Sequence, residues 1–158
     1  MSLLRTLMLL ALVVWVGGII FFAFVEAPTA FHVLPNTELA GNVVGPSLTK
    51  LHWIGIVCGL VSLLSSVAYN NLKYAQTRLL SGVHILVFVM LVLTCISQFA
   101  ITPRMHTLRA EMKNAVTSAN DPRAAEFDRL HHWSERLEGG VLLCGLVAVV
   151  LTGRRNST

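Results

Sequence analysis

The chain has 158 residues and a formal net charge of +4, and 54% of its residues are hydrophobic while only 13% are charged. A soluble domain carries about 25% charged residues, so this composition, with a mean hydropathy of +0.68, excludes an ordinary water-soluble fold and indicates a membrane protein. The basic residues form no stripe of the kind that binds nucleic acid, so the lipid bilayer is an expected partner and nucleic acid is not.

Four apolar segments are long enough to cross a membrane, at about residues 3–25, 46–68, 79–101 and 134–152. A helix needs roughly 20 residues to cross a hydrocarbon core of about 30 Å, and each segment meets that length. Four spans leave no room for a soluble domain. The sequence therefore predicts an all-α membrane protein, a single four-helix transmembrane bundle over residues 1–158, with the third and fourth helices extended on the outer side.

The first span has two features of its own. Arg5 precedes an apolar run like that of a signal peptide, but the run is too long for one, so we expect an uncleaved span. Gly17 and Gly18 lie together inside the same span. Because small residues let membrane helices approach each other closely, these two glycines predict a helix-packing face.

The connection between the first two spans, residues 26–47, contains three prolines. Proline is tolerated in the first turn of a helix, but in the interior of a helix it removes a hydrogen bond and crowds the preceding turn. We therefore expect Pro28, Pro35 and Pro46 to break this connection into interfacial turns or half-helices.

The connection between the third and fourth spans predicts an outer helical hairpin at about residues 103–133. Hydrophobic side chains recur there at helical spacing, at Met105, Leu108, Met112 and Val116. Asp121-Pro122 is a strong helix start, with an acid at the N-cap and proline at the first helical position. We therefore expect the fourth helix to begin outside the bilayer, to pair with the preceding helix, and to enter the membrane without a break.

The distribution of basic residues predicts the orientation. One side of the bundle carries five basic residues and no acid, all in short segments: Arg5, Lys73, Arg78, Arg154 and Arg155. The positive-inside rule counts Lys and Arg in short segments close to the spans. Both termini are therefore expected in the cytoplasm.

Ionisable side chains gather at the opposite, outer end, which holds five of the six histidines. Glu138 is followed at once by an apolar run, about one helical turn below the interface that Trp133 marks. Ionisable residues inside a membrane are costly and usually face the bundle interior or a wet cavity. We therefore predict a ligand-binding cluster at the outer mouth, with a proton relay and structural ion pairing, the default, as alternatives: Glu26, His52, Ser134 and Glu138.

A metal site is a second interpretation of the same end. His131 and Glu135 stand at i and i+4 on one face of the fourth helix, and His106 lies on the other helix of the predicted hairpin. Imidazole is a good ligand for copper and zinc. These three residues are the candidate metal ligands, with copper or zinc as the metal, although the same spacing is common in solvated surface pairs.

His84 differs from the other histidines because it lies inside a span, in the predicted cytoplasmic half. Ser81 lies one turn away and offers a hydroxyl group as a partner. A hydrogen-bonded interior histidine is favoured here over an axial haem ligand, so haem is a less favoured cofactor than copper or zinc.

The chain resembles the transmembrane protein 205-like family, whose bacterial members are catalogued as a domain of unknown function, in "WVGGIIFFAFVEAPTAFHVLPNTELAGNVVG", "ITPRMHTLR" and "FDRLHHWSERLEGG". The most specific piece is Leu130, His131 and Ser134. Family members often carry Asn seven residues after that His, where this chain has Glu138. The "WVGG" stretch also resembles copper resistance protein D. The resemblance implies a four-span helical fold, here in a bacterial inner membrane, and marks His131 as a site of interest without implying a reaction.

The leading hypothesis is a non-enzymatic integral membrane protein that binds a small polar ligand or a transition-metal ion at the outer cluster, for transport or resistance. Two alternatives stay open. One is a structural or accessory subunit of a larger membrane complex, or a homo-oligomer that uses the Gly17-Gly18 face. The other is a haem or quinone redox protein that uses His84 and an outer histidine.

Overall fold

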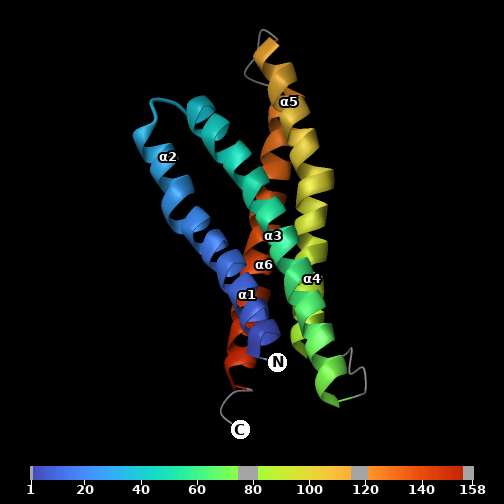
Figure 1. Cartoon of the computed structure of the whole chain (residues 1–158). Coiled ribbons are helices and arrows are strands. Elements are labelled where there is room, and N and C mark those ends of the chain that lie inside the picture. The colour runs from blue at the N-terminus through green and yellow to red at the C-terminus, as the bar shows by residue number, and fades with distance from the viewer. Residues whose placement is uncertain (1, 75–81, 115–120, 155–158) are drawn as a thin grey trace.

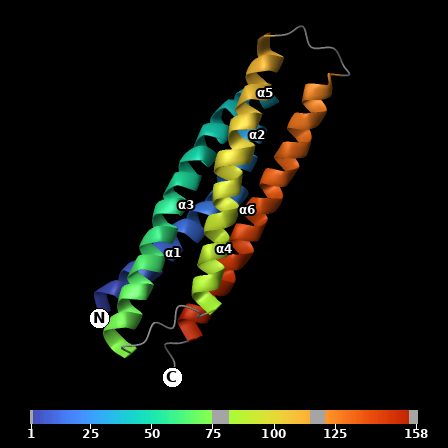
Figure 2. The same ribbon diagram turned by 90° about the vertical axis from the view of Figure 1, so that its right-hand side faces the viewer.

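The computed structural model describes residues 2–74, 82–114 and 121–154, and every element in these ranges is a helix. The elements in chain order are α1 (Ser2–Phe21), η1 (Phe22–Glu26), α2 (Ala27–Val33), α3 (Thr37–Tyr74), α4 (Gly82–Ile96), η2 (Ser97–Ile101), α5 (Thr102–Asn114) and α6 (Pro122–Arg154). The segments η1 and η2 are π-helical and continue the preceding α-helix. The described chain thus forms four rods: α1–η1–α2, α3, α4–η2–α5 and α6 (Figures 1 and 2).

All four rods are long and apolar enough to cross a membrane, with candidate spans at Leu3–Val33, Thr37–Tyr69, Gly82–Met112 and Pro122–Gly153. The start of α1 and the end of α6 lie at one end of the bundle, and α2, α5 and the start of α6 lie at the other, which we call the hairpin end (Figure 1). The predicted all-α four-helix membrane bundle is confirmed. Residues 79–81 of the predicted third span lie outside the described residues.

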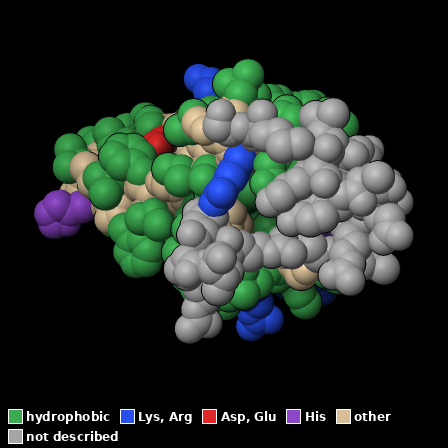
Figure 3. Space-filling model, turned by 60° about the horizontal axis from the view of Figure 1, so that its bottom comes forward, with side chains coloured by type: hydrophobic (Ala, Val, Ile, Leu, Met, Phe, Trp, Pro, Cys, Tyr) green, Lys and Arg blue, Asp and Glu red, His purple; other side chains and the backbone are tan. Residues whose placement is uncertain are grey.

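The surface of the bundle is apolar where that of a soluble protein would be charged. Large hydrophobic side chains are exposed on every rod, among them Phe24, Leu64, Phe88 and Leu143. Seen toward the end at which the termini lie, hydrophobic side chains cover much of the described surface (Figure 3). Soluble monomers rarely expose apolar surface on this scale, so these side chains are suited to face lipid.

Trp15 of α1 lies in the middle of the core and is 1% exposed. It packs against two glycines of α3: a Cβ on Gly55 would overlap the indole ring, and a Cβ on Gly59 would lie 2.7 Å from it. Real Cβ atoms do not approach other atoms this closely. The close packing of α1 on α3 therefore depends on the missing side chains at these two positions.

The glycine pair that was predicted to form a packing face is divided between two sides of α1. A Cβ on Gly18 would lie 2.8 Å from Cδ1 of Leu51 in α3. A Cβ on Gly17 would meet nothing within 4 Å in the part of the chain that the structure describes. Successive residues of an α-helix lie about 100° apart, so only one of the two glycines turns toward α3. The packing expected of Gly17 falls instead on Gly55 and Gly59.

The three prolines of the first connection do not all interrupt the helices. Pro28 lies within the α1–η1–α2 rod, and Pro46 lies inside α3. Only Pro35 lies in a break of the helical backbone, at residues 34–36. The expectation of short turns and half-helices is therefore wrong for Pro28 and Pro46.

The π-helical segment η1 explains how the first rod passes Pro28. Proline has no backbone N–H, and its ring crowds the carbonyl four residues back, here that of Phe24 in the middle of η1. In the wider π turn the backbone N–H of Ala27 donates to the carbonyl of Phe22, five residues back. The backbone is thereby relieved of the clash and the rod continues into α2.

The second π-helical segment, η2, stands in the same relation to Pro103. It ends at Ile101, two residues before the proline, and Phe99 is the residue whose carbonyl the proline ring would crowd. Both the backbone N–H and the Oγ1 hydroxyl of Thr102 donate to the carbonyl of Ser97, the hydroxyl at 2.9 Å. The third rod therefore continues into α5.

At the hairpin end, α5 packs beside the first half of α6, as the sequence predicts. Arg104 of α5 donates from Nε and Nη2 to the two carboxylate oxygens of Glu126 of α6, at 2.8 and 2.9 Å. Leu108 is fully buried, while Val116 lies outside the described residues. The helix α6 begins at Pro122 and runs for 33 residues without a break.

Asp121 precedes α6, and its carboxyl group is expected to ionise at unusually low pH. Arg123 donates to it from Nη2 at 2.6 Å and from its backbone N–H at 2.9 Å, and these bonds lower the pKa of Asp121. A carboxyl group whose pKa is lowered by folding stabilises the fold above its unfolded pKa, about 3.9, and this contribution is lost as the pH falls through the folded pKa.

An NMR pH titration of the Arg123 backbone amide, which donates to the Asp121 carboxyl group, measures the pKa of Asp121. We expect its signal to shift with a midpoint below that of a free aspartate, and Asp121→Asn should remove the transition. A midpoint at or above the free-aspartate value would contradict the expectation.

Candidate functional site

His52 joins three of the four rods in the interior of the bundle. The helix α3 places its ring among α3, η2 and α6, where the residue is 1% exposed. His52 Nδ1 lies 2.9 Å from Oε1 of Gln98 in η2, and His52 Nε2 lies 2.6 Å from Oε1 of Glu138 near the middle of α6. The structure thus brings together two of the predicted ligand-binding residues, His52 and Glu138.

The hydrogen bonds of His52 determine where its protons lie. Because Gln98 Oε1 accepts a hydrogen bond, Nδ1 of His52 carries a proton, and Nε2 faces Glu138. At 2.6 Å a proton lies between Nε2 and the carboxyl oxygen, donated either by an imidazolium or by a carboxylic acid. In both arrangements the pair holds one shared proton and has no net charge, which is the state that a low-dielectric interior favours.

Glu138 also lines a pocket of about 530 Å³, whereas His52 is not among the lining residues described. The Glu138 side chain is 15% exposed, whereas the His52 side chain is 1% exposed. Residues of α1, η1, α2 and the first half of α3 form one wall of the pocket, and residues of α5 and α6 form the other. The volume lies within the range of about 300–1,000 Å³ that is typical of small-molecule sites.

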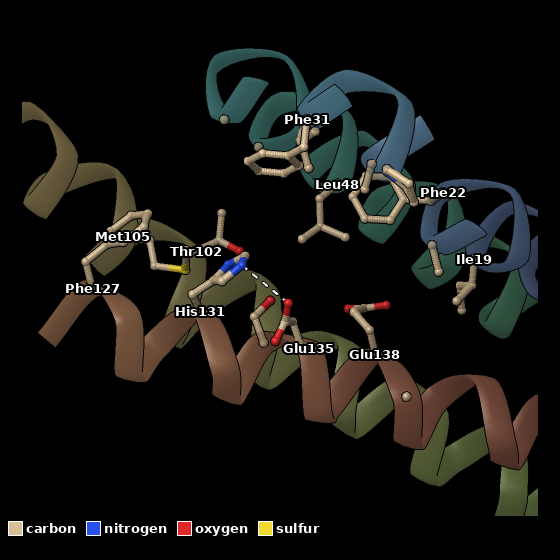
Figure 4. A pocket seen from close by; sticks show the side chains of 18 of the residues that line it. Ile19, Phe22, Phe31, Leu48, Thr102, Met105, Phe127, His131, Glu135 and Glu138 are labelled. Carbon is tan, nitrogen blue, oxygen red and sulfur yellow. Dashed lines mark ion pairs between the residues drawn. The ribbon is translucent and has the colours of Figure 1, made fainter. Parts of the chain in front are cut away.

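The pocket combines an apolar wall with a polar face of α6. Phe22 and Phe31 lie on one side of the cavity, and His131, Glu135 and Glu138 point into it from the other (Figure 4). The three residues of α6 recur at i, i+4 and i+7, which places them on one helical face, as the sequence predicts. The lining is therefore amphipathic, and three of its ionisable groups lie in one line along α6.

Ser134 adds a hydroxyl group to the polar face of α6, and Glu135 pairs with both neighbouring histidines. Ser134 lines the same pocket and is 5% exposed. Glu135 Oε1 lies 3.4 Å from His131 Nε2, and its other oxygen lies 3.2 Å from Nδ1 of His132. The His131 and Glu135 side chains are 44% and 60% exposed, so solvent screens this pair and its contribution to stability is small.

Arg109 of α5 lines the pocket toward the hairpin end. Its Nη1 donates to the carbonyl of Gly41 in α3 at 2.7 Å, and its guanidinium lies 5.3 Å from the centre of the Phe127 ring. A Cβ on Gly41 would overlap the guanidinium, so this glycine makes room for the cation. Arg109 thereby ties α5 to α3 and to α6.

The candidate metal ligands line the pocket but do not form a metal-binding group. His131 and Glu135 make the pair described above, and His106 is an exposed residue of α5 on the same pocket. Among the residues that the structure describes, no three His, Cys, Asp or Glu side chains are grouped so that they could hold a metal ion. Zinc sites in proteins use three or four protein ligands, so copper or zinc binding stays a prediction without a geometry to support it.

Two other predicted residues lie apart from the His52–Glu138 pair. Glu26 ends η1, is half-buried, and is not among the described residues that line the pocket. His84 of α4 is buried, and its Nε2 lies 2.6 Å from Oγ of Ser66 in α3. Ser81, the neighbour predicted for His84, lies outside the described residues.

Two residues of the site were not predicted as site residues from the sequence. Gln98 fixes the tautomer of His52, and Arg109 is the cation of the pocket. A signal for Gln98 was present, because a glutamine within an apolar span must find a hydrogen-bond partner. Arg109 gave no comparable signal, since an arginine in a polar connection is ordinary.

The fold and the site define the class of protein. It is a membrane bundle of four helical rods, in which the His52–Glu138 pair lies at the edge of a pocket between the rods. The chain belongs to the family described as a domain of unknown function, DUF4149, which matches residues 10–114. Comparisons with curated proteins and with solved structures gave no match. The matched part contains His52 and Gln98, whereas Glu138 and the rest of α6 lie beyond it.

Proposed function

We propose that this protein is a non-enzymatic integral membrane protein that binds a small molecule with a polar group in the pocket beside Glu138, for transport or resistance. The observation that carries the proposal is the arrangement of Glu138, which forms a hydrogen bond with the buried His52 and also lines the cavity. Ionisable residues at membrane depth are costly, and those that persist there mark ligand or ion pathways.

A purely structural role for Glu138 accounts for less of the geometry. A structural ion pair needs no cavity, yet Glu138 lines a pocket of about 530 Å³ whose opposite wall is apolar. A mainly apolar cavity with a few convergent polar groups is the usual form of a small-molecule site. The small-ligand version is favoured over the metal version, because no group of three metal-binding side chains occurs in the described chain.

The orientation belongs to the same proposal. Arg5 belongs to α1, which starts at the end opposite the hairpin end, and the segments predicted on that side carry basic residues and no acids, so we place both termini in the cytoplasm and the hairpin end on the outer side. The resemblance to the transmembrane protein 205-like family, and the bacterial inner membrane that it implies, also stay proposals. The pocket is then reached from the outer side of the membrane or from its outer leaflet.

Blocking the pocket tests the proposal. Gly139 lines the pocket, and a Cβ there would meet nothing within 4 Å among the described residues, so Gly139→Phe is expected to fill the cavity without displacing a neighbour. Gly17 is equally open but does not line the pocket, which makes Gly17→Phe the matched control. The probes are tetraphenylphosphonium, tetraphenylborate and neutral triphenylphosphine oxide, titrated calorimetrically into purified protein in detergent.

We expect at least one probe to bind the wild-type protein and the control alike, and to bind Gly139→Phe at least about tenfold more weakly, a loss of about 1.4 kcal/mol. Absence of binding by all three probes, or equal binding by both variants, would overturn the proposal. The metal version has its own check: zinc is titrated into wild-type protein and into His131→Ala, and equal binding discards it.

A further inference from the structure

We infer that the ligand of the pocket is a singly charged amphipathic organic cation, and that it binds in exchange for the proton that Glu138 shares with His52. This inference rests on the proposed function, because it needs a ligand in the pocket. It adds the charge of the ligand and a stoichiometry of one proton for one cation. The charges that face Glu138, the apolar surface around it and the conservation of charge in the site support this inference.

The only basic side chain described in contact with Glu138 is His52. The pocket-lining residues of α1, η1, α2 and α3 include no ionisable side chain. On α5 the pocket is lined by His106 and Arg109, and on α6 by His131 and Glu135. Of the two acids that line the pocket, Glu135 is 60% exposed and pairs with the exposed His131, whereas Glu138 is 15% exposed and its charge is balanced by the one proton that it shares with His52.

Arg109 does not compete for this carboxylate. Its guanidinium lies over Phe127, which precedes Glu138 by eleven residues on α6, or about 16 Å along the helix axis. One of its nitrogen atoms also donates to the carbonyl of Gly41. The cation at the hairpin end of the pocket and the acid deeper in the bundle therefore act on different parts of a bound molecule.

The surface around Glu138 suits the apolar body of a cation. Ile19, Phe22 and Leu48 lie across the cavity from the carboxyl group (Figure 4). An aromatic ring face attracts a positive charge, and the attraction is greatest when the charge is poorly hydrated. A carboxylate beside phenylalanine and aliphatic side chains thus matches an ammonium or phosphonium centre that carries apolar groups.

Conservation of charge makes the exchange one for one. Before binding, Glu138 and His52 with their shared proton are neutral together. When the cation enters, the shared proton leaves to a base in the solvent, Glu138 stays as a carboxylate against the cation, and His52 stays neutral with its Nδ1 proton held by Gln98. The site is neutral before and after. Binding without proton release would leave an uncompensated charge in a low-dielectric interior, which is strongly disfavoured.

Calorimetry of tetraphenylphosphonium binding in buffers of different ionisation enthalpy counts the protons released. The measurement covers the range in which imidazole groups titrate, about pH 5 to pH 8. We expect one proton released per cation wherever the pair holds its proton, and binding about tenfold tighter for each unit rise in pH there. Tetraphenylborate, of the same shape and opposite charge, is expected to release none.

Variants locate the exchanged proton. Glu138→Gln is expected to remove both the proton release and the pH dependence. Glu126→Gln, on the same helix but paired with Arg104 outside the pocket, should behave as the wild-type protein. If Glu138→Gln does not fold, the proton count on the wild-type protein decides alone.

The outcomes separate this inference from the proposed function. Tetraphenylphosphonium binding that Gly139→Phe weakens, but that releases no proton at any pH in the range, overturns the exchange and leaves the pocket as a ligand site. Preferred binding of tetraphenylborate overturns the cation class in the same way. Failure of all three probes to bind overturns the proposed function, and this inference with it.

Discussion

Replacing Gly59 with leucine is expected to destabilise the bundle by about 3 kcal/mol, the upper end of the cost of overpacking a core. A Cβ at this position would already lie 2.6 Å from Leu91 of α4 and 2.7 Å from Trp15 of α1. Leu91 and Trp15 are 9% and 1% exposed, so neither side chain has free space to move into. The added side chain must therefore separate α3 from α1 and α4.

Unfolding of the purified protein by sodium dodecyl sulfate, followed by circular dichroism, measures this cost. Gly17→Leu is the matched control, because a Cβ at Gly17 meets no described atom within 4 Å. Leucine is also a better helix former than glycine, so the control should be at least as stable as the wild-type protein. Equal stability of Gly59→Leu and the control would contradict the close packing of α1, α3 and α4 around Trp15.

Replacing His52 with leucine is expected to cost about 1–3 kcal/mol of stability. The substitution removes two interhelical hydrogen bonds at once, to Gln98 and to Glu138. Such bonds contribute about 0.6 kcal/mol on average and about 1.7 kcal/mol at most in membrane proteins. The loss is smaller than that of a buried pair in a fully enclosed core, because Glu138 still reaches the pocket.

A double-mutant cycle tests whether His52 and Gln98 act as a unit. His52→Leu and Gln98→Leu each break the same bond, so the double variant should be less destabilised than the sum of the single variants. His32→Leu is the control, since His32 is an exposed residue of α2. Strict additivity, or no loss of stability in His52→Leu beyond that of the control, would contradict a structural role for the bond between His52 and Gln98.

The spans and the start of α6 could be predicted from the sequence because their signals are local. The length of an apolar run decides whether a helix crosses a membrane, and Asp121-Pro122 carries its own capping chemistry. The common face of His131, Glu135 and Glu138 follows from helical spacing alone. These parts of the fold and site need no knowledge of which rod packs against which.

The remainder depends on contacts between rods. Nothing near His52 in the sequence specifies Gln98 or Glu138 as its partner, since they lie 46 and 86 residues away. The glycines that pack against Trp15 are Gly55 and Gly59 on the facing helix, because the position of Trp15 decides where a side chain of α3 is excluded. Pairing between rods is a property of the assembled bundle.

Each π-helical segment amounts to an α-helix with one residue inserted, because its hydrogen bonds span five residues instead of four. Deleting that residue would turn the downstream helix by about 100°. Phe31 lies beyond η1 and Arg109 beyond η2, so either deletion would carry a pocket residue off its wall. In an alignment of relatives, a one-residue gap near position 24 or 99 is therefore the mark of a chain that has reshaped this cavity.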